Sequence, residues 1–260
     1  MSKNTTAIKK TSSKYIIAGV IAILLCVATT IYFANTNKTD TNKNETTSEQ
    51  KSENKDAYAS INKDDITLVK SEGDTIWYLN DSYYFYKTSP IVAIVRIDSI
   101  GGGRNFNPIH NQYVSPQTVG RMTIIQPIKG EVEYGEQVSY ARLGAILPVE
   151  DYLKGLSKAE QDKLNHLNKG NKLSGYIKSK FAEDIDIEVD KTYLVFLRRD
   201  ISKDGKIAEY VMEGMQYGMR EVKDSQAREL KAGTKISSNI EILNNETGTW
   251  EKISTAVEIK

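Results

Sequence analysis

Hydrophobic and β-branched residues recur in short runs from about residue 58 to the end of the chain, with turn-forming residues between the runs. Short apolar runs that are interrupted in this way are typical of β-strands. We predict a mainly β domain over residues 58–260, with strands at 66–69, 75–79, 91–97, 119–126, 137–142, 193–198, 206–212, 240–243 and 250–253.

Two turns and one helix complete this pattern. Asp204-Gly205 and the run "NNETG", residues 244–248, each indicate a hairpin between neighbouring predicted strands. Ser157 stands three residues before Glu160, which is the spacing of a helix capping box, and Gly170 supplies a stop signal. Because this helix falls between strands, we expect a short helical insertion or cap on a β-barrel or sandwich, and not a crossover in a parallel sheet.

A different hydrophobic pattern lies near the start of the chain, where no residue from Tyr15 to Phe33 is charged. As a helix this run is about 28 Å long, close to the roughly 30 Å of a bilayer core. It is longer than the apolar part of a cleaved signal peptide, and the leucines before Cys26 do not fit a lipoprotein signal. We predict a transmembrane helix over residues 15–34, with cleavage as the main alternative and lipidation at Cys26 as the last.

The flanks of this run predict its orientation. Four lysines and no acidic residue precede it, so residues 1–14 are expected in the cytoplasm and the rest of the chain outside. Residues 35–57 follow as a mixture of charged residues, Asn, Thr and Ser, which predicts a disordered tether. The expected localisation is therefore the cell membrane, with a single-pass signal-anchor and an extracellular C-terminal domain.

Composition excludes several classes of site in the exported region. The only cysteine of the sequence is Cys26, which lies inside the predicted span and not in residues 58–260. Disulfides, a thiolate nucleophile and cysteine-ligated metal are therefore excluded from 58–260. The net charge of +1 gives no electrostatic reason to expect a nucleic-acid partner. We predict neither a metal site nor a cofactor.

The candidate binding residues are the aromatic side chains of "IWYLNDSYYFYK", residues 76–87. Aromatic rings with polar edges suit a surface that binds a glycan or a partner protein. They equally suit two half-buried strands joined at Asn80-Asp81, and the sequence favours this structural interpretation. The residues proposed for binding are Trp77, Tyr78, Tyr83, Tyr84 and Tyr86.

Three other features have both a structural and a functional interpretation. "GGGRNFNPIHN", residues 101–111, is expected to be a flexible loop, with Arg104 and His110 as ligand contacts in the alternative. "AEDIDIEVD", residues 182–190, alternates acids with aliphatic residues, which predicts a strand with one solvated acidic face or, alternatively, a face for calcium or a cationic partner. His166 is expected on the helix surface and not in a zinc site.

Three segments together resemble a family of uncharacterised exported or membrane-anchored proteins of Gram-positive bacteria. They are "SPIVAIVRIDSI", "VGRMTIIQPIKGEVEYGEQVSYA" and "DKTYLVFLRR". The stretch from the first to the last of them, residues 89–199, covers about half of the exported region. The resemblance implies a small OB-like β-barrel and an envelope location, and it implies no catalytic residue. Similar proteins have a glycine at the position of Asp190.

Two hypotheses about function remain. The first is a non-catalytic, membrane-tethered binding or assembly module of the cell envelope, with an envelope protein or glycan as partner. The second is a cell-envelope hydrolase that uses paired carboxylates, which would converge in a pocket with shifted pKa values. Because no enzyme motif accompanies the candidate residues, the sequence favours the binding module.

Overall fold

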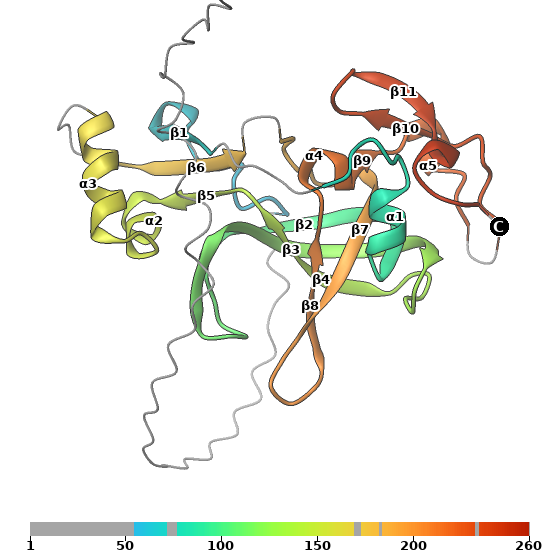
Figure 1. Cartoon of the computed structure of the whole chain (residues 1–260), viewed down its shortest axis with the longest axis horizontal. Helices are drawn as coiled ribbons and strands as arrows, with labels where there is room; N and C mark the ends of the chain where they lie inside the picture. Colours follow the sequence, from blue (N-terminus) through green and yellow to red (C-terminus); the bar gives the residue numbers. More distant parts are fainter. Residues whose placement is uncertain (1–54, 72–76, 169–172, 182–183, 232–233, 260) are drawn as a thin grey trace, which may run out of the picture. The chain divides into compact units, whose positions relative to one another are not determined.

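Two long antiparallel strands, β2 (Ile91–Asn107) and β3 (Gln112–Lys129), dominate the fold (Figure 1). The computed structural model describes residues 55–71, 77–168, 173–181, 184–231 and 234–259. In this part of the chain most of the regular structure is β, which confirms the predicted mainly β class.

The strands that pair with β2 and β3 form a closed ring of five. These are β4 (Gln137–Leu143), β7 (Thr192–Ile201) and β8 (Ile207–Met212). The order around the ring is β2, β3, β4, β8, β7 and back to β2. Every neighbouring pair is antiparallel except β4 and β8, which are parallel. The short strand β9 (Met219–Glu221) adds to β7.

Two smaller sheets and several short helices surround this ring. The first sheet has the order β1 (Ile66–Ser71), β6 (Tyr176–Phe181), β5 (Ala145–Pro148), and the second is the hairpin of β10 (Glu241–Asn244) and β11 (Thr249–Lys252). The helices are α1 (Tyr84–Thr88), α2 (Val149–Lys154), α3 (Lys158–Leu167), α4 (Met215–Gly218) and α5 (Asp224–Ala227). Two 3-10 turns, η1 (Lys63–Asp65) and η2 (Ile253–Thr255), complete the secondary structure.

The ring strands β2 and β7 bury both of their faces. Ala93 and Val95 of β2 point into one core cluster with ring residues such as Val195, whereas Val92 and Ile94 pack in a second cluster. That second cluster joins β2 and β7 to α1 and to the C-terminal hairpin. Burial on both sides explains why "IVAIV" and "YLVFL" are continuous apolar runs without polar alternation.

Most of the predicted elements are confirmed within a few residues. The helix begins as predicted, because the Ser157 side chain accepts from the Glu160 amide and the Glu160 carboxylate accepts from the Ser157 amide. Both predicted hairpins are present, and the turn glycines Gly205 and Gly248 have φ angles of 81° and 68°. Such angles belong to the left-handed region that glycine adopts without strain.

Two predictions about strands and loops are wrong, and three short strands were not predicted. Residues 77–79 of the predicted strand 75–79 are not in a strand. The glycine run 101–103 is not a loop, because it lies within β2, where an added Cβ at Gly103 would lie 2.3 Å from the Ile146 carbonyl oxygen of β5. The glycines are needed for this close approach of two backbones. The short strands β5, β6 and β9 were not predicted at all.

The acidic run does not form the predicted strand. Residues 184–188 belong to no strand, and Val189 and Asp190 form a turn. Ile185, Ile187 and Val189 do pack on the ring core, so the alternation is correct there. Asp190 closes this segment with a φ of 64°, a left-handed angle that is uncommon for residues other than glycine.

The described part of the chain begins with a short bridge to the ring. The Ala57 amide donates to the Ile100 carbonyl oxygen at 2.9 Å, and the Ile100 amide donates to the Lys55 carbonyl oxygen at 2.8 Å. The predicted anchor at 15–34 with Cys26, the segment 1–14 and the tether up to residue 54 lie outside the described residues. Among the helices that the structure does describe, none is long and apolar enough to cross a bilayer.

Candidate functional site

The predicted aromatic residues fall on α1 and on the irregular segment before it, and they have unequal surroundings. Phe85, which was not among the candidates, is the buried ring at 9% exposure. Its ring centre lies 5.2 Å from Trp77 and from Tyr84 and 5.8 Å from Phe196 of β7. Trp77 also contacts Tyr217 edge-on at 6.0 Å. The rings therefore attach α1 to the second core cluster, but the segment is a short helix with irregular structure before it and not the two half-buried strands that the structural interpretation predicts.

The other candidates divide between packing and exposure. The Tyr83 hydroxyl donates to the Ser254 carbonyl oxygen at 2.7 Å, which ties α1 to η2. The Lys129 ammonium lies 5.2 Å from the centre of the Tyr86 ring and donates to the Tyr86 carbonyl oxygen at 2.6 Å. Tyr78, in contrast, is 74% exposed and touches only the edge of the group, at Tyr84. The five residues are therefore not one continuous recognition surface.

A pocket of about 220 Å³ lies between this aromatic segment and the C-terminal hairpin. Its apolar wall includes Tyr84, Phe85 and Phe196, and its polar side comes from α4, β9, the turn between β10 and β11, and β11. The polar lining residues are Asp81, Ser82, Gln216, Arg220, Asn244, Asn245, Glu246, Glu251 and Thr255. Of the predicted binding residues, only Tyr84 lines it.

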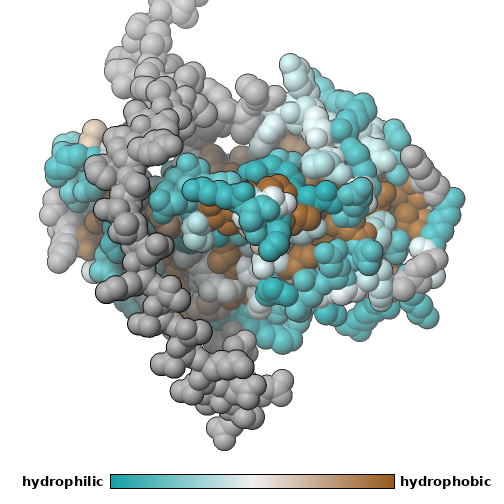
Figure 2. Space-filling model, turned by 90° about the horizontal axis from the view of Figure 1, so that it is seen from below, coloured by the Kyte–Doolittle hydropathy of each residue, from teal (hydrophilic) through white to brown (hydrophobic). Residues whose placement is uncertain are grey.

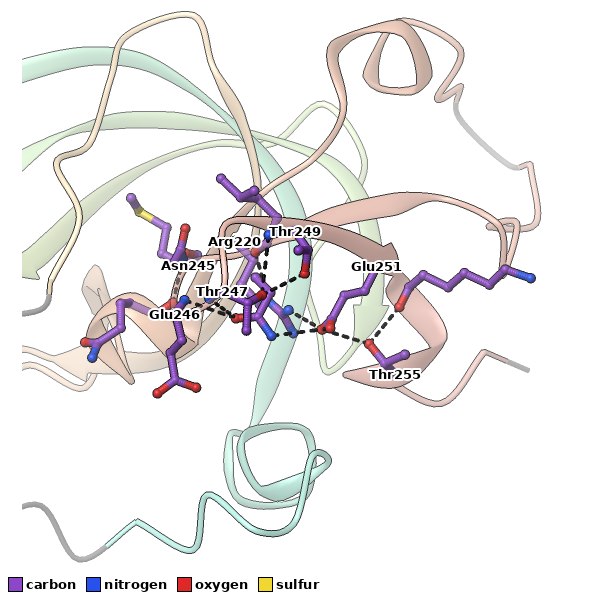
Figure 3. Close-up of polar contacts among 12 residues, drawn as sticks. Arg220, Asn245, Glu246, Thr247, Thr249, Glu251 and Thr255 are labelled. Atoms are coloured by element: carbon purple, nitrogen blue, oxygen red, sulfur yellow. Dashed lines mark hydrogen bonds and ion pairs between the residues drawn. The ribbon is translucent and has the colours of Figure 1, made fainter.

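A partly buried ion pair forms one side of the pocket. Arg220 points toward Glu251 (Figure 3), and its guanidinium donates to that carboxylate and, at 3.1 Å from Nε, to the Leu243 carbonyl oxygen. The Thr255 hydroxyl donates to the same carboxylate at 3.0 Å. Burial acts to raise the pKa of Glu251, but the hydrogen bond and charge of Arg220 together with hydrogen bonds from Thr255 and Asn244 hold it below its ordinary value.

The least expected polar group of the pocket is the amide of Gln216. Its side chain makes no hydrogen bond within the described part of the chain, although the residue is only 9% exposed. Its backbone is fixed, because the Asn245 side chain donates to the Gln216 carbonyl oxygen at 2.6 Å and to the Met219 carbonyl oxygen at 2.8 Å (Figure 3). Unlike the buried Oε1 of Gln126, the amide atoms of Gln216 are reached by solvent, so they can bond a molecule that enters the pocket.

A second pocket of about 370 Å³ also borders α1. It shares Tyr84 and Phe85 with the first pocket, and it adds Trp77. The Glu213 carboxylate that lines it accepts from the Ser89 hydroxyl at 3.1 Å. Two of the five predicted residues, Trp77 and Tyr84, thus lie beside a pocket.

Arg104 and His110, proposed from the glycine-rich run, connect two hairpins. His110 Nε2 lies 2.5 Å from the Asp200 carboxylate, which also accepts from Asn107 at 3.2 Å. Arg104 donates to the buried carboxylate of Glu209, which pairs with Asp200 across β7 and β8. Burial acts to raise the pKa of Asp200, but the hydrogen bonds from His110 and Asn107 hold it below its ordinary value. These contacts lie within the domain, so they account for Arg104 and His110 as structural residues.

The acids of residues 184–190 do not share one face as predicted. Asp184 is buried in an ion pair with Arg142, whereas Asp186 meets Lys178 at 2.6 Å and Lys180 at 3.6 Å. Asp190 pairs with Lys55 at 3.2 Å. His166 lies in the last turn of α3. Within the described ranges no three His, Cys, Asp or Glu side chains form a group that would hold a metal ion.

No family model, curated protein or solved structure matches the chain. Figure 2 shows hydrophobic residues in several places between hydrophilic ones on the face that it presents. The pocket beside α1 is therefore the candidate site on its own chemistry, which combines aromatic walls, an internally neutralised ion pair and an unpartnered amide.

Proposed function

We propose that this protein is a membrane-tethered, extracytoplasmic binding or assembly module of the cell envelope. The location rests on the uncharged run at 15–34, on the lysines before it and on the polar segment after it. The partner is an envelope component, either a glycan or a protein, that reaches the domain from outside. Binding, and not catalysis, is the role that the candidate site supports best.

The observation that carries this proposal is the amide of Gln216, which makes no hydrogen bond within the described residues and lines a pocket with aromatic walls. Ligand sites are concave and mostly apolar, with a few polar groups that fix the orientation of the ligand. Tyr84 and Phe85 supply the apolar wall, and Arg220 is held in place by Glu251. The pocket therefore has the composition of a small binding site whose polar groups are already oriented.

We further propose that the ring is an OB-like β-barrel. Its first strand, β2, pairs with the second and the fourth ring strands, and the third and fifth strands, β4 and β8, run parallel. The helices α2 and α3 fall between the third and fourth ring strands. This connectivity agrees with an OB-fold, a five-stranded barrel that serves as a binding platform in many proteins.

The hydrolase hypothesis has one observation in its favour, because Glu246 and Glu251 both line the pocket. A glycosidase of the paired-carboxylate type needs a general acid whose pKa is raised above its ordinary value. Arg220 has the opposite effect on Glu251, whose pKa is lowered. This favours a binding role for the pair, and we propose that Glu251 positions Arg220.

The membrane topology is tested by adding protease to intact cells that carry epitope tags at both ends of the protein. The C-terminal tag should be removed while the N-terminal tag stays protected. A mature protein released into the medium, or equal protection of both tags, would refute the anchor.

Binding at the pocket is tested in the same cells with a photoreactive benzophenone amino acid at position 82 of the full-length protein. Ser82 is exposed and lines the pocket, so a bound envelope component should be captured there on illumination. The matched control places the same group at Asp204, an exposed turn residue that does not line the pocket. Capture at neither position, or equal capture at both, would contradict the assignment of the pocket.

A further inference from the structure

We infer that the pocket beside α1 binds one neutral sugar unit of an envelope glycan. This inference rests on the proposed binding function and names the chemical class of its ligand. It follows from the size of the pocket, from the distribution of charge around it and from the hydrogen-bonding groups that are left without a partner.

The size limits the ligand to a small unit. The pocket has a volume of about 220 Å³. It is smaller than the sites of drug-sized ligands, which begin at about 300 Å³. A single hexose ring or a short side chain is of this size, so a longer glycan would place one unit in the pocket and the rest outside.

The charges favour a neutral ligand over an ion. Arg220 and Glu251 neutralise each other within the wall, and Lys87 pairs with Asp81 at 2.7 Å near the rim. Glu246 has no cationic partner in the described part of the chain, but it is exposed and solvated, and it accepts from the Tyr217 hydroxyl at 2.8 Å. A charged ligand would lose its hydration without meeting a buried opposite charge, whereas a neutral polar ligand avoids this cost.

The hydrogen-bonding groups favour hydroxyls over an apolar ligand. The Gln216 amide offers two N–H donors and a carbonyl acceptor, and none of them has a partner within the described ranges. A sugar hydroxyl both donates and accepts, so two neighbouring hydroxyls match one amide. The rings of Tyr84 and Phe85 border the same space and suit the C–H face of a sugar ring. An apolar ligand of the same size would leave the amide without a partner.

The test titrates the full-length protein, purified in a detergent without a sugar head group, with four small probes and follows its amide signals by NMR. Two probes are neutral sugars, methyl glucoside and N-acetylglucosamine, one is the cation butylammonium and one is the anion acetate. At least one sugar should shift the Gln216 side-chain signals with a dissociation constant on the order of 1 mM, as expected for a ligand of this size. The two ions should bind at least about tenfold more weakly.

Two matched variants connect binding to the amide. Gln216→Met removes the unpartnered amide at nearly constant volume, so it should fold as stably as the wild type while its affinity for the sugar falls about tenfold. Gln126→Met is the control, because Gln126 is also 9% exposed and has a buried Oε1 without a partner but does not line the pocket. Its affinity for the sugar should stay the same.

The inference is overturned if neither sugar shifts pocket signals at a concentration of about 50 mM, which is 50-fold above the expected dissociation constant. It is also overturned if butylammonium binds more tightly than the sugars. Full affinity of both variants for the sugar would overturn it as well. The photocapture experiment separates this failure from failure of the proposed function. Capture at position 82 together with no sugar binding would refute only the ligand class. No capture together with no sugar binding would refute both.

Discussion

Replacing Phe85 with alanine should lower the free energy of unfolding by about 3 to 5 kcal/mol. The ring is 9% exposed and packs against three others, Trp77, Tyr84 and Phe196, at centre distances of 5.2 to 5.8 Å. Truncation removes the burial energy of the ring and leaves a cavity beside β7. Because aromatic pairs add roughly 0.5 to 1.5 kcal/mol each beyond burial, we expect the upper half of the range.

The assay is urea denaturation of the full-length protein, followed by far-UV circular dichroism. The midpoint should fall while the dependence on urea stays constant, since the change alters packing and not the surface exposed on unfolding. Tyr78→Ala is the matched control, because this ring is 74% exposed and its loss should cost less than about 0.5 kcal/mol. If Tyr78→Ala destabilised the protein as much as Phe85→Ala, the assignment of core and surface in this segment would be wrong.

Three further predictions concern other parts of the fold. Asp184→Ala should cost about 3 to 5 kcal/mol of folding free energy, because it leaves Arg142 as a buried charge, and Arg142→Met in the same chain should recover part of that loss in denaturation curves. Ser157→Ala should cost about 1 kcal/mol by removing the cap of α3, and a loss below 0.2 kcal/mol would contradict it. Since the pKa of Asp200 is lowered on folding, its contribution to stability is present above its unfolded pKa of about 3.9 and is lost as the pH falls through the folded value. Asp200→Asn should therefore flatten the loss of stability below about pH 4, and an unchanged acid limb would refute this.

The strands that could be predicted are those whose sequence alone indicates burial, because it is a continuous apolar run. "IVAIV" and "YLVFL" are apolar at every position because β2 and β7 have a core on each side. The strands that were missed, such as β5 and β6, are short or mix lysine with apolar residues, and their place is set by partners far along the chain. The glycines at 101–103 gave the wrong prediction because a close backbone approach and a flexible loop require the same residue.

The candidate site was only partly predictable for a related reason. The aromatic run lies beside two pockets, since Tyr84 lines both of them and Trp77 lines one. Its polar partners Gln216, Arg220 and Glu251 come from three separate elements, and no spacing links them. The sequence does not single out Gln216, because only the fold shows that its amide lines the pocket and makes no hydrogen bond within the described residues.

The bridge between residues 55–57 and Ile100 has a mechanical consequence. If the chain is anchored at 15–34 as proposed, any pull between membrane and ligand enters the domain through this bridge. The bridge is held by two backbone hydrogen bonds and by the exposed ion pair of Lys55 with Asp190. These contacts are weak, so we expect them to break before the force acts on the closed ring of strands. Release of these three residues would lengthen the connection by about 10 Å. If the proposed anchor exists, the bridge would thus open before the strands of the ring bear the load.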